Sequence, residues 1–196
     1  MAWTVVDCAR LLGFRSGLAV ADSALRSLIT EPCRREHLAQ LDSALLAQKG
    51  RHQVAVARAV TAYASPLAES GGESVSRAVL KEMGIPEPVL QYEIRTPAGE
   101  FVARTDMAWP QDRTVGEFDG ALKYRRGAST RDVDPGRIVY EEKRREDAIR
   151  GLGWEMVRWG WADLDDPEAL AAHIRHALAR GRMRAKYEQA ALGRAS

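Results

Sequence analysis

The sequence lacks any long apolar run. Its longest candidate, residues 17–25, is interrupted by Asp22 and Ser23, so it falls short of the roughly 20 residues that a membrane-spanning helix needs. The first residues also lack the basic start and apolar centre of a secretory signal. We therefore expect no association with a membrane and a cytoplasmic location.

Cysteine is scarce, and neither sign of charge dominates. The spacing of Cys8 and Cys33 matches no metal or redox motif, so we expect two buried thiols in a reducing compartment. Because 29 basic residues face 27 acidic ones, the net charge is only +2, which excludes a strong global attraction to nucleic acid. The basic residues nevertheless crowd into residues 123–126, 143–145 and 175–186, and such local patches steer polyanions more than net charge does.

Apolar residues at helical spacing dominate the first third of the chain. Leu38, Leu41 and Leu45 form one such stripe. The sequence therefore predicts a helical region over residues 1–64. Ser65-Pro66 and the glycine pair at 71–72 interrupt the pattern, and residues 73–83 resume it.

The periodicity changes after Gly84, where short segments alternate in a way typical of strands. Predicted strands cover residues 89–96, 101–109, 113–119 and 155–159; predicted helices cover residues 138–152 and 165–180; residues 123–137 read as a loop. Because connections of three and four residues join only antiparallel neighbours, the first three strands form a meander. We therefore expect an α+β protein, with an α-β-β-β-α-β core over residues 65–180 and a C-terminal helical tail over 181–196.

Carboxylates occupy particular places in this pattern. Glu117 and Asp119 share one face of the third strand, because side chains alternate along a strand. A hairpin centred between residues 111 and 112 places Asp106 directly opposite Glu117, and opposed like charges destabilise a sheet. A divalent cation such as Mg²⁺ or Mn²⁺ removes that repulsion, prefers carboxylate oxygens, and can activate water for phosphodiester hydrolysis.

Cations surround the predicted carboxylate site. Lys123, Arg125 and Arg126 follow the third strand, while Lys143 and Arg145 lie on the next helix. These side chains are candidates for holding a nucleic-acid backbone. Lys123 could also polarise an attacking water, provided that its pKa is depressed.

Four segments together resemble a known superfamily. In chain order they are Glu73-Ser74-Val75-Ser76-Arg77, Arg104-Thr105-Asp106-Met107-Ala108-Trp109-Pro110, Val115-Gly116-Glu117-Phe118-Asp119-Gly120 and residues 145–154. They resemble the restriction-endonuclease-like PD-(D/E)XK superfamily, close to its very-short-patch-repair branch. The architecture resembles actinobacterial proteins that join an AbiEi-type antitoxin-like N-terminal region to such a domain. The resemblance covers roughly residues 65–180 and, more weakly, 5–46.

The resemblance implies a DNA endonuclease in which Asp106 and Glu117 ligate Mg²⁺ or Mn²⁺. It makes Glu73 the helix carboxylate that orients a water molecule, with Lys123 and Arg145 on the phosphate. Asp119 stands where the superfamily motif has lysine, and three interpretations follow. Asp119 ligates the metal, Lys123 replaces the lysine from a shifted position, or the site is catalytically inactive.

Alternatives to the DNA nuclease stay open. The chain could be an inactive nuclease-fold module that binds DNA or a toxin as an antitoxin or regulator, or a nuclease acting on RNA. A purely structural interpretation pairs Asp106 and Glu117 with Arg104 and Arg113 on an exposed sheet face. It also explains Glu73 by the helix dipole, which favours an acid in the first turn.

Overall fold

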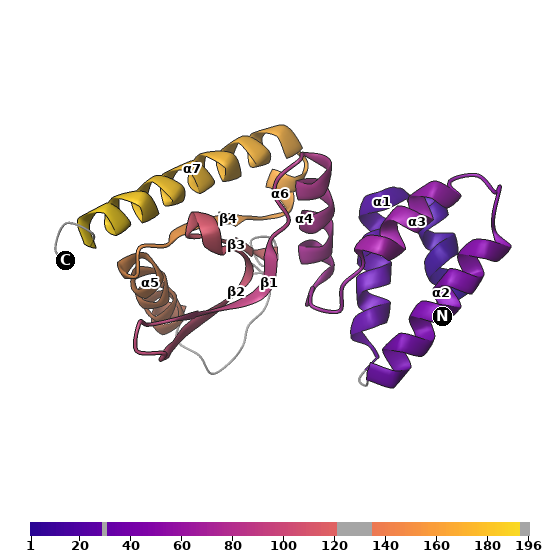
Figure 1. Ribbon diagram of the computed structural model, residues 1–196, viewed down its shortest axis with the longest axis horizontal. Helices are drawn as coiled ribbons and strands as arrows, with labels where there is room; N and C mark the ends of the chain where they lie inside the picture. Colours follow the sequence, from indigo (N-terminus) through magenta and orange to yellow (C-terminus); the bar gives the residue numbers. More distant parts are fainter. Residues whose placement is uncertain (29–30, 121–134, 193–196) are drawn as a thin grey trace. The chain divides into compact units, whose positions relative to one another are not determined.

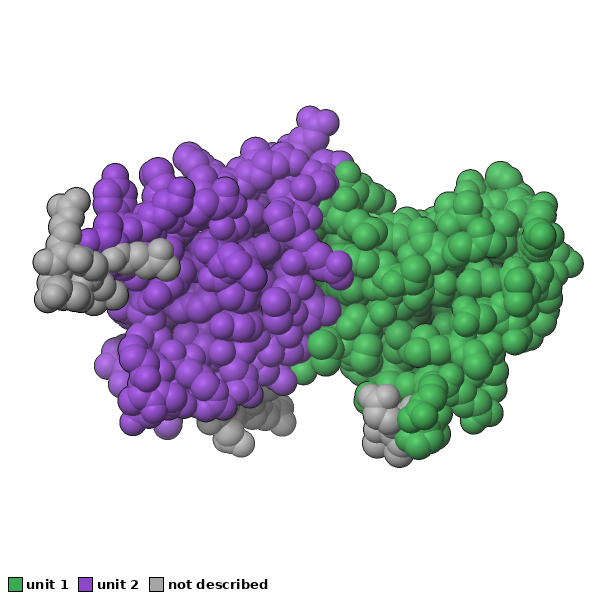
Figure 2. Space-filling view, in the orientation of Figure 1, with its two compact units in different colours: residues 1–82 green, residues 83–196 purple. Residues whose placement is uncertain are grey.

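The structure is a computed structural model that describes residues 1–28, 31–120 and 135–192. It divides into two compact units, residues 1–82 and 83–196 (Figure 2). Unit 1 contains helices, whereas unit 2 contains a four-stranded sheet with further helices (Figure 1). This confirms the α+β class. The sequence predicts a domain boundary after residue 64, whereas the compact units divide after Glu82, so that the helix over 71–82 belongs to unit 1.

Unit 1 is built from α1 (Ala2–Arg26), α2 (Glu31–Ala47), α3 (Val54–Tyr63) and α4 (Gly71–Glu82). A sharp bend interrupts α1 at Gly13, whose φ of 79° favours glycine. The bend brings the second half of α1 against the first. A Cβ atom on Gly17 would lie 2.7 Å from the Cα of Ala9, so the close approach requires glycine there as well.

A buried ion pair ties α1 to α4. Arg77 Nη1 lies 2.5 Å from Asp22 Oδ2, and the two side chains are 3% and 0% exposed. Arg77 Nη2 donates to the Tyr63 carbonyl at 2.8 Å, and the Ser65 N–H donates to Asp22 Oδ1 at 2.8 Å. These contacts satisfy the charges that burial would otherwise penalise. They give Arg77, part of the first segment of the resemblance, a structural role in unit 1.

The sheet of unit 2 has the strand order β1-β2-β3-β4. Its strands are β1 (Val89–Arg95), β2 (Phe101–Trp109), β3 (Thr114–Phe118) and β4 (Glu155–Trp159). The first three are antiparallel neighbours, as the meander predicted, and the short helix η1 (Pro110–Asp112) joins β2 to β3. The fourth strand returns parallel to β3.

Helices α5 (Pro135–Gly151) and α7 (Pro167–Leu192) cover opposite faces of this sheet, and α6 (Trp161–Leu164) precedes α7 (Figure 1). Val115 packs in a cluster with Ile149 of α5. The preceding residue, Thr114, instead faces α7: its hydroxyl lies 3.4 Å from the Ala177 carbonyl and donates to the Asp112 carbonyl at 2.9 Å. Because adjacent strand residues face opposite sides, the two helices lie on different faces.

Helix α7 continues through Gly181, where the sequence analysis separates a last helix from a tail. A Cβ atom there would lie 2.0 Å from the backbone oxygen of Asp112. The glycine therefore permits close packing of α7 against η1 and does not end the helix.

Two further expectations concern cysteine and membranes. Cys8 is partly buried and Cys33 is exposed, so the expectation of two buried thiols is wrong. Within the described ranges, none of the helices combines the length and the apolar character that crossing a membrane requires.

Candidate functional site

The β2–β3 hairpin gathers the predicted carboxylates at one end of the sheet. Its register pairs Met107 with Gly116, and one further step places Asp106 opposite Glu117. Asp106 Oδ2 accepts a hydrogen bond from the Phe118 N–H at 3.0 Å. The Asp119 N–H donates to a carbonyl of β4 at 2.8 Å, so Asp119 follows on along β3. Asp106 and Glu117 are therefore opposite each other on β2 and β3, and Asp119 lies just past the end of β3, bonded to β4.

Two arginines hold the carboxylate of Glu117, whose side chain is 14% exposed. Arg145 reaches it from α5, with Nη2 on Oε1 and Nη1 on Oε2 at 3.2 Å. Arg158 is the register partner of Glu117 in β4, and its buried Nε lies 3.3 Å from Oε2, as an ion pair without hydrogen-bond geometry. The hydrogen bond that Arg145 donates to Glu117 is the main reason that the pKa of Arg145 is raised.

The same arginines also bind acids on α5. Arg145 Nη1 lies 3.2 Å from Glu142 Oε1, and Arg158 Nη2 pairs with the same oxygen. Arg158 Nη1 lies 3.8 Å from Glu146 Oε2. We call the five residues joined by these contacts the α5 network: Glu117, Glu142, Arg145, Glu146 and Arg158. It links α5 to β3 and β4, and it contains three carboxylates against two guanidinium groups.

This arrangement does not fit a divalent metal at Asp106, Glu117 and Asp119. Mg²⁺ needs carboxylate oxygens at about 2.0–2.1 Å and usually keeps several waters. Both oxygens of Glu117 are engaged by Arg145, and the Arg158 guanidinium beside them would repel a dication. Across residues 1–28, 31–120 and 135–192, no group of three or more His, Cys, Asp or Glu side chains is arranged to hold a metal ion.

Glu73 caps α4 in unit 1. Its N–H donates to Ser70 Oγ at 3.1 Å, and its carboxylate accepts from the Ser70 hydroxyl at 2.8 Å and from the Glu69 N–H at 2.7 Å. This reciprocal pattern resembles a capping box, which satisfies free backbone donors at a helix start. The side chain is thus used locally, and its role in orienting a water molecule stays a prediction.

The predicted cations divide into two groups. Lys123, Arg125 and Arg126 lie outside the described residues. Lys143 is exposed on α5, whereas Arg145 is held in the α5 network and also donates from Nη2 to the Arg104 carbonyl at 2.9 Å. The phosphate contacts of Lys143 and Arg145 stay predictions.

Sequence reasoning missed Arg158, because it named Arg104 and Arg113 as the arginines near the carboxylates. Arg113 instead donates to the Leu152 carbonyl at 3.0 Å and lies 3.4 Å from Glu188 of α7. Placing β4 parallel to β3 would have revealed Arg158 beside Glu117. The sequence contains no local signal for that pairing, because the two strands are far apart along the chain.

Comparisons with known proteins leave the activity open. No family model matches the chain, and no solved structure matches it. The chain is similar to two uncharacterized proteins of Mycobacterium tuberculosis, MT2308 of strain CDC 1551 / Oshkosh and Rv2248 of strain ATCC 25618 / H37Rv. Each is 34% identical over 183 residues, which cover 93% of this chain. The chain spans 62% of the length of these relatives.

Proposed function

We propose that unit 2 is a DNA-binding module in which the α5 network takes the place that a nuclease reserves for its metal. The engagement of Glu117 by Arg145 and Arg158 carries this proposal, because a carboxylate with both oxygens on guanidinium groups is a poor ligand for a dication. Asp119 supports it further, since it stands at the position where the motif has the lysine that assists the attacking water. The proposed role is therefore binding or regulation without phosphodiester hydrolysis.

DNA is the proposed ligand for two reasons. The four segments resemble those of enzymes that act on DNA, and the ligand class is carried over from that resemblance. Exposed cations are also present: Lys143 and Arg144 lie on α5, where phosphate contacts would be electrostatically favourable. The proposal implies a cytoplasmic location, whose reducing conditions suit a sequence with only two cysteines.

Calorimetric titration with Mn²⁺ and a DNA-binding assay test this proposal together. The 196-residue chain is titrated with Mn²⁺ alone and compared with Asp106→Asn, and with Glu93→Gln as a matched exposed strand carboxylate. Binding of a fluorescein-labelled duplex is then measured with EDTA or with Mg²⁺. We expect the same metal titration for all three proteins, duplex binding that is independent of Mg²⁺, and an intact supercoiled plasmid after incubation with Mg²⁺ or Mn²⁺.

A Mg²⁺-dependent DNA nuclease is the second candidate, favoured by the register that sets Asp106 opposite Glu117. Opposed carboxylates followed by Asp119 are the donors such an enzyme would use. Stoichiometric Mn²⁺ binding that is lost in Asp106→Asn, together with plasmid cleavage that is lost in Glu117→Gln, would replace the first proposal by this one.

A further inference from the structure

A second charged region lies on the opposite face of the sheet from the α5 network. Helix α7 has no acidic residue between Glu168 and Glu188. Within that span it carries five exposed cations, Arg175, Arg182 and Lys186 on one flank of the helix and Arg180 and Arg184 on the other, at 3.6 residues per turn. We call these five residues together the basic face. At about 1.5 Å per residue, the basic face extends over about 17 Å of helix.

Two carboxylates beneath α7 orient three of these arginines. Glu155 of β4 binds both Arg180 and Arg184, at 3.2 and 3.1 Å, and its own side chain is only 7% exposed. Asp112 of η1 binds Arg182 through both oxygens, at 2.7 and 2.9 Å. The hydrogen bond to Asp112 is the main reason that the pKa of Arg182 is raised.

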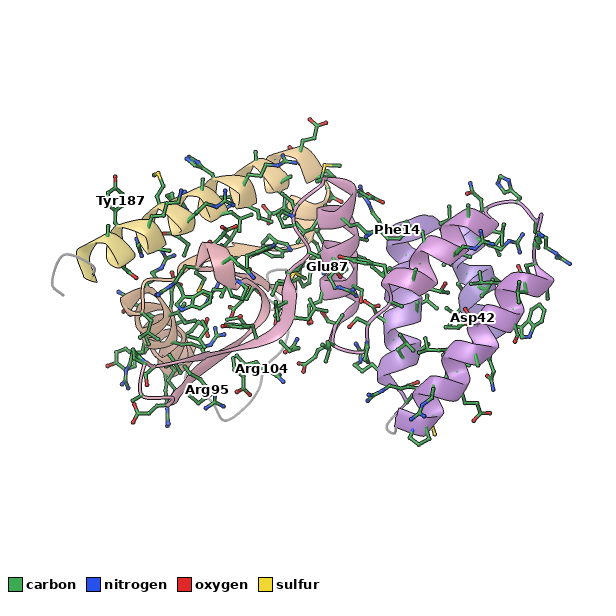
Figure 3. All side chains as sticks on the ribbon, viewed as in Figure 1. Phe14, Asp42, Glu87, Arg95, Arg104 and Tyr187 are labelled. Carbon is green, nitrogen blue, oxygen red and sulfur yellow. The ribbon has the colours of Figure 1, made fainter. Side chains whose placement is uncertain are left out.

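The arginines remain accessible despite these contacts. The side chains of Arg180 and Arg184 are each 45% exposed, and that of Arg182 is 56% exposed. Tyr187, 76% exposed, also projects from α7 away from the sheet (Figure 3). The acids therefore fix one side of each guanidinium, while its remaining N–H groups stay available to an external acceptor.

The charge balance distinguishes this region from the α5 network. In the α5 network three carboxylates exceed two guanidinium groups. On the basic face, five cations exceed the two carboxylates Glu155 and Asp112 by three among the described residues. A neighbouring pair, Arg113 with Glu188, is balanced. Among the residues that the structure describes, the α7 side of the sheet thus combines oriented guanidinium groups with a local excess of positive charge, which favours a polyanion.

We infer that the basic face of α7 is the surface that contacts the phosphate backbone of duplex DNA. This inference rests on the proposed function and assigns its DNA contact to a different helix from the α5 cations that the sequence favours. Guanidinium groups held from one side bind phosphate oxygens with charge-assisted hydrogen bonds at little cost in side-chain entropy. The contacts are to the backbone, so the basic face contributes affinity and orientation and leaves base readout to other residues.

The salt dependence of duplex binding tests this surface. The 196-residue chain is titrated onto a short fluorescein-labelled duplex at several NaCl concentrations between about 50 and 200 mM. The test variant is Arg184→Gln/Lys186→Gln, which leaves Glu155 paired with Arg180. The control is Arg137→Gln/Arg150→Gln, which removes the same charge from α5 residues that each have a carboxylate partner at i±4. Circular dichroism confirms that both variants are folded.

Each neutralised phosphate contributes about 0.9 to the slope of log K against log salt. We expect the α7 variant to bind more weakly and its slope to fall by about 2, while the control retains the wild-type slope. An unchanged slope in the α7 variant, or a reduced slope in Lys143→Gln instead, would overturn the assignment of the DNA contact to the basic face. The proposed function would stand in either case. Failure of the wild-type protein to bind any duplex, or binding of RNA in place of DNA, overturns both.

Discussion

The substitution Glu117→Gln distinguishes a metal site from an ion-pair network, because the two interpretations predict opposite changes in the free energy of unfolding. In a site that awaits a metal, Glu117 and Asp106 repel each other, so removing one charge leaves the metal-free protein as stable as before or more stable. In the α5 network, Glu117 is the common partner of Arg145 and Arg158. Its neutralisation then leaves two partly buried guanidinium groups short of a counter-ion, and the protein loses stability.

The magnitude follows from the burial of the three side chains. Glu117, Arg145 and Arg158 are 14%, 29% and 32% exposed, so their ion pairs are neither fully exposed nor fully buried. An exposed ion pair contributes about 0.2–1 kcal/mol, and a hydrogen bond to a charged group contributes about 1.5–3 kcal/mol. The contribution of Glu117 should lie between these two values. Glutamine keeps the shape and one acceptor oxygen for Arg145. We expect Glu117→Gln to lower the free energy of unfolding by about 1–2 kcal/mol, which corresponds to about 3–6 °C in the unfolding midpoint.

Tryptophan fluorescence is the appropriate assay, because four of the five tryptophans lie in unit 2 and therefore report the unit that contains Glu117. The control is Glu93→Gln, since Glu93 pairs with Arg95 on the surface and is 49% exposed. Its loss should stay within about 0.2–1 kcal/mol. All measurements are made in EDTA and repeated with Mg²⁺.

Two results would refute the reasoning. The first is a Glu117→Gln protein that is at least as stable as the wild type in EDTA. The second is a wild-type protein stabilised by Mg²⁺ in a concentration-dependent way, with the effect abolished by Glu117→Gln. Either result would mean that the arginines do not hold Glu117 strongly enough to exclude an ion.

Three further substitutions test other parts of the structure. Arg77→Met leaves Asp22 buried without its counter-ion and should lower the stability of unit 1 by about 3–5 kcal/mol, measured by hydrogen exchange of its amides in the full chain. Gly181→Ala places a Cβ atom 2.0 Å from the Asp112 backbone oxygen and should cost about 1–3 kcal/mol, read from tryptophan fluorescence. Burial lowers the pKa of His37, so the folded state binds fewer protons than the unfolded state and stability should fall as the pH drops below about 6.5. His37→Gln should flatten that dependence in thermal unfolding.

Each of these substitutions has a matched control. Arg15 pairs with Glu82 on the surface, at 40% and 34% exposure, so Arg15→Met should cost about 0.2–1 kcal/mol, and a loss equal to that of Arg77→Met would argue against burial as the cause. Gly151 faces open space, so Gly151→Ala should leave the packing of unit 2 intact, unlike Gly181→Ala. His52 is exposed; a pH profile that flattens in His52→Gln but not in His37→Gln would contradict the assignment.

The strands could be predicted because their signals are local. Residues 101–109 and 155–159 combine β-branched or aromatic side chains with flanking turn residues, and the structure forms β2 and β4 over those ranges. The meander follows from short connections alone, because chain geometry permits no other pairing. The same local reasoning extends to the hairpin register and hence to the juxtaposition of Asp106 and Glu117.

Features that depend on distant segments could not be predicted in this way. Arg158 reaches Glu117 only because β4 joins β3 in parallel, and sheet order is not encoded by periodicity. Gly181 resembles a helix end in the sequence, and its actual role depends on how closely η1 approaches α7. The role of Arg158 and the need for glycine at position 181 are both set by contacts with residues that are distant in the sequence.

The β2–β3 hairpin is compatible with either a metal ion or an arginine beside Asp106 and Glu117, because either one relieves the repulsion between the two carboxylates. The position of Arg158 is the main reason for favouring the arginine. Arg145 approaches from α5, where a rotamer change would release it, whereas the backbone of Arg158 is fixed beside Glu117 by the β3–β4 register. A metal would therefore compete with a positive charge that the sheet itself holds in place. That competition is the physical reason for expecting binding at this domain without metal-dependent cleavage.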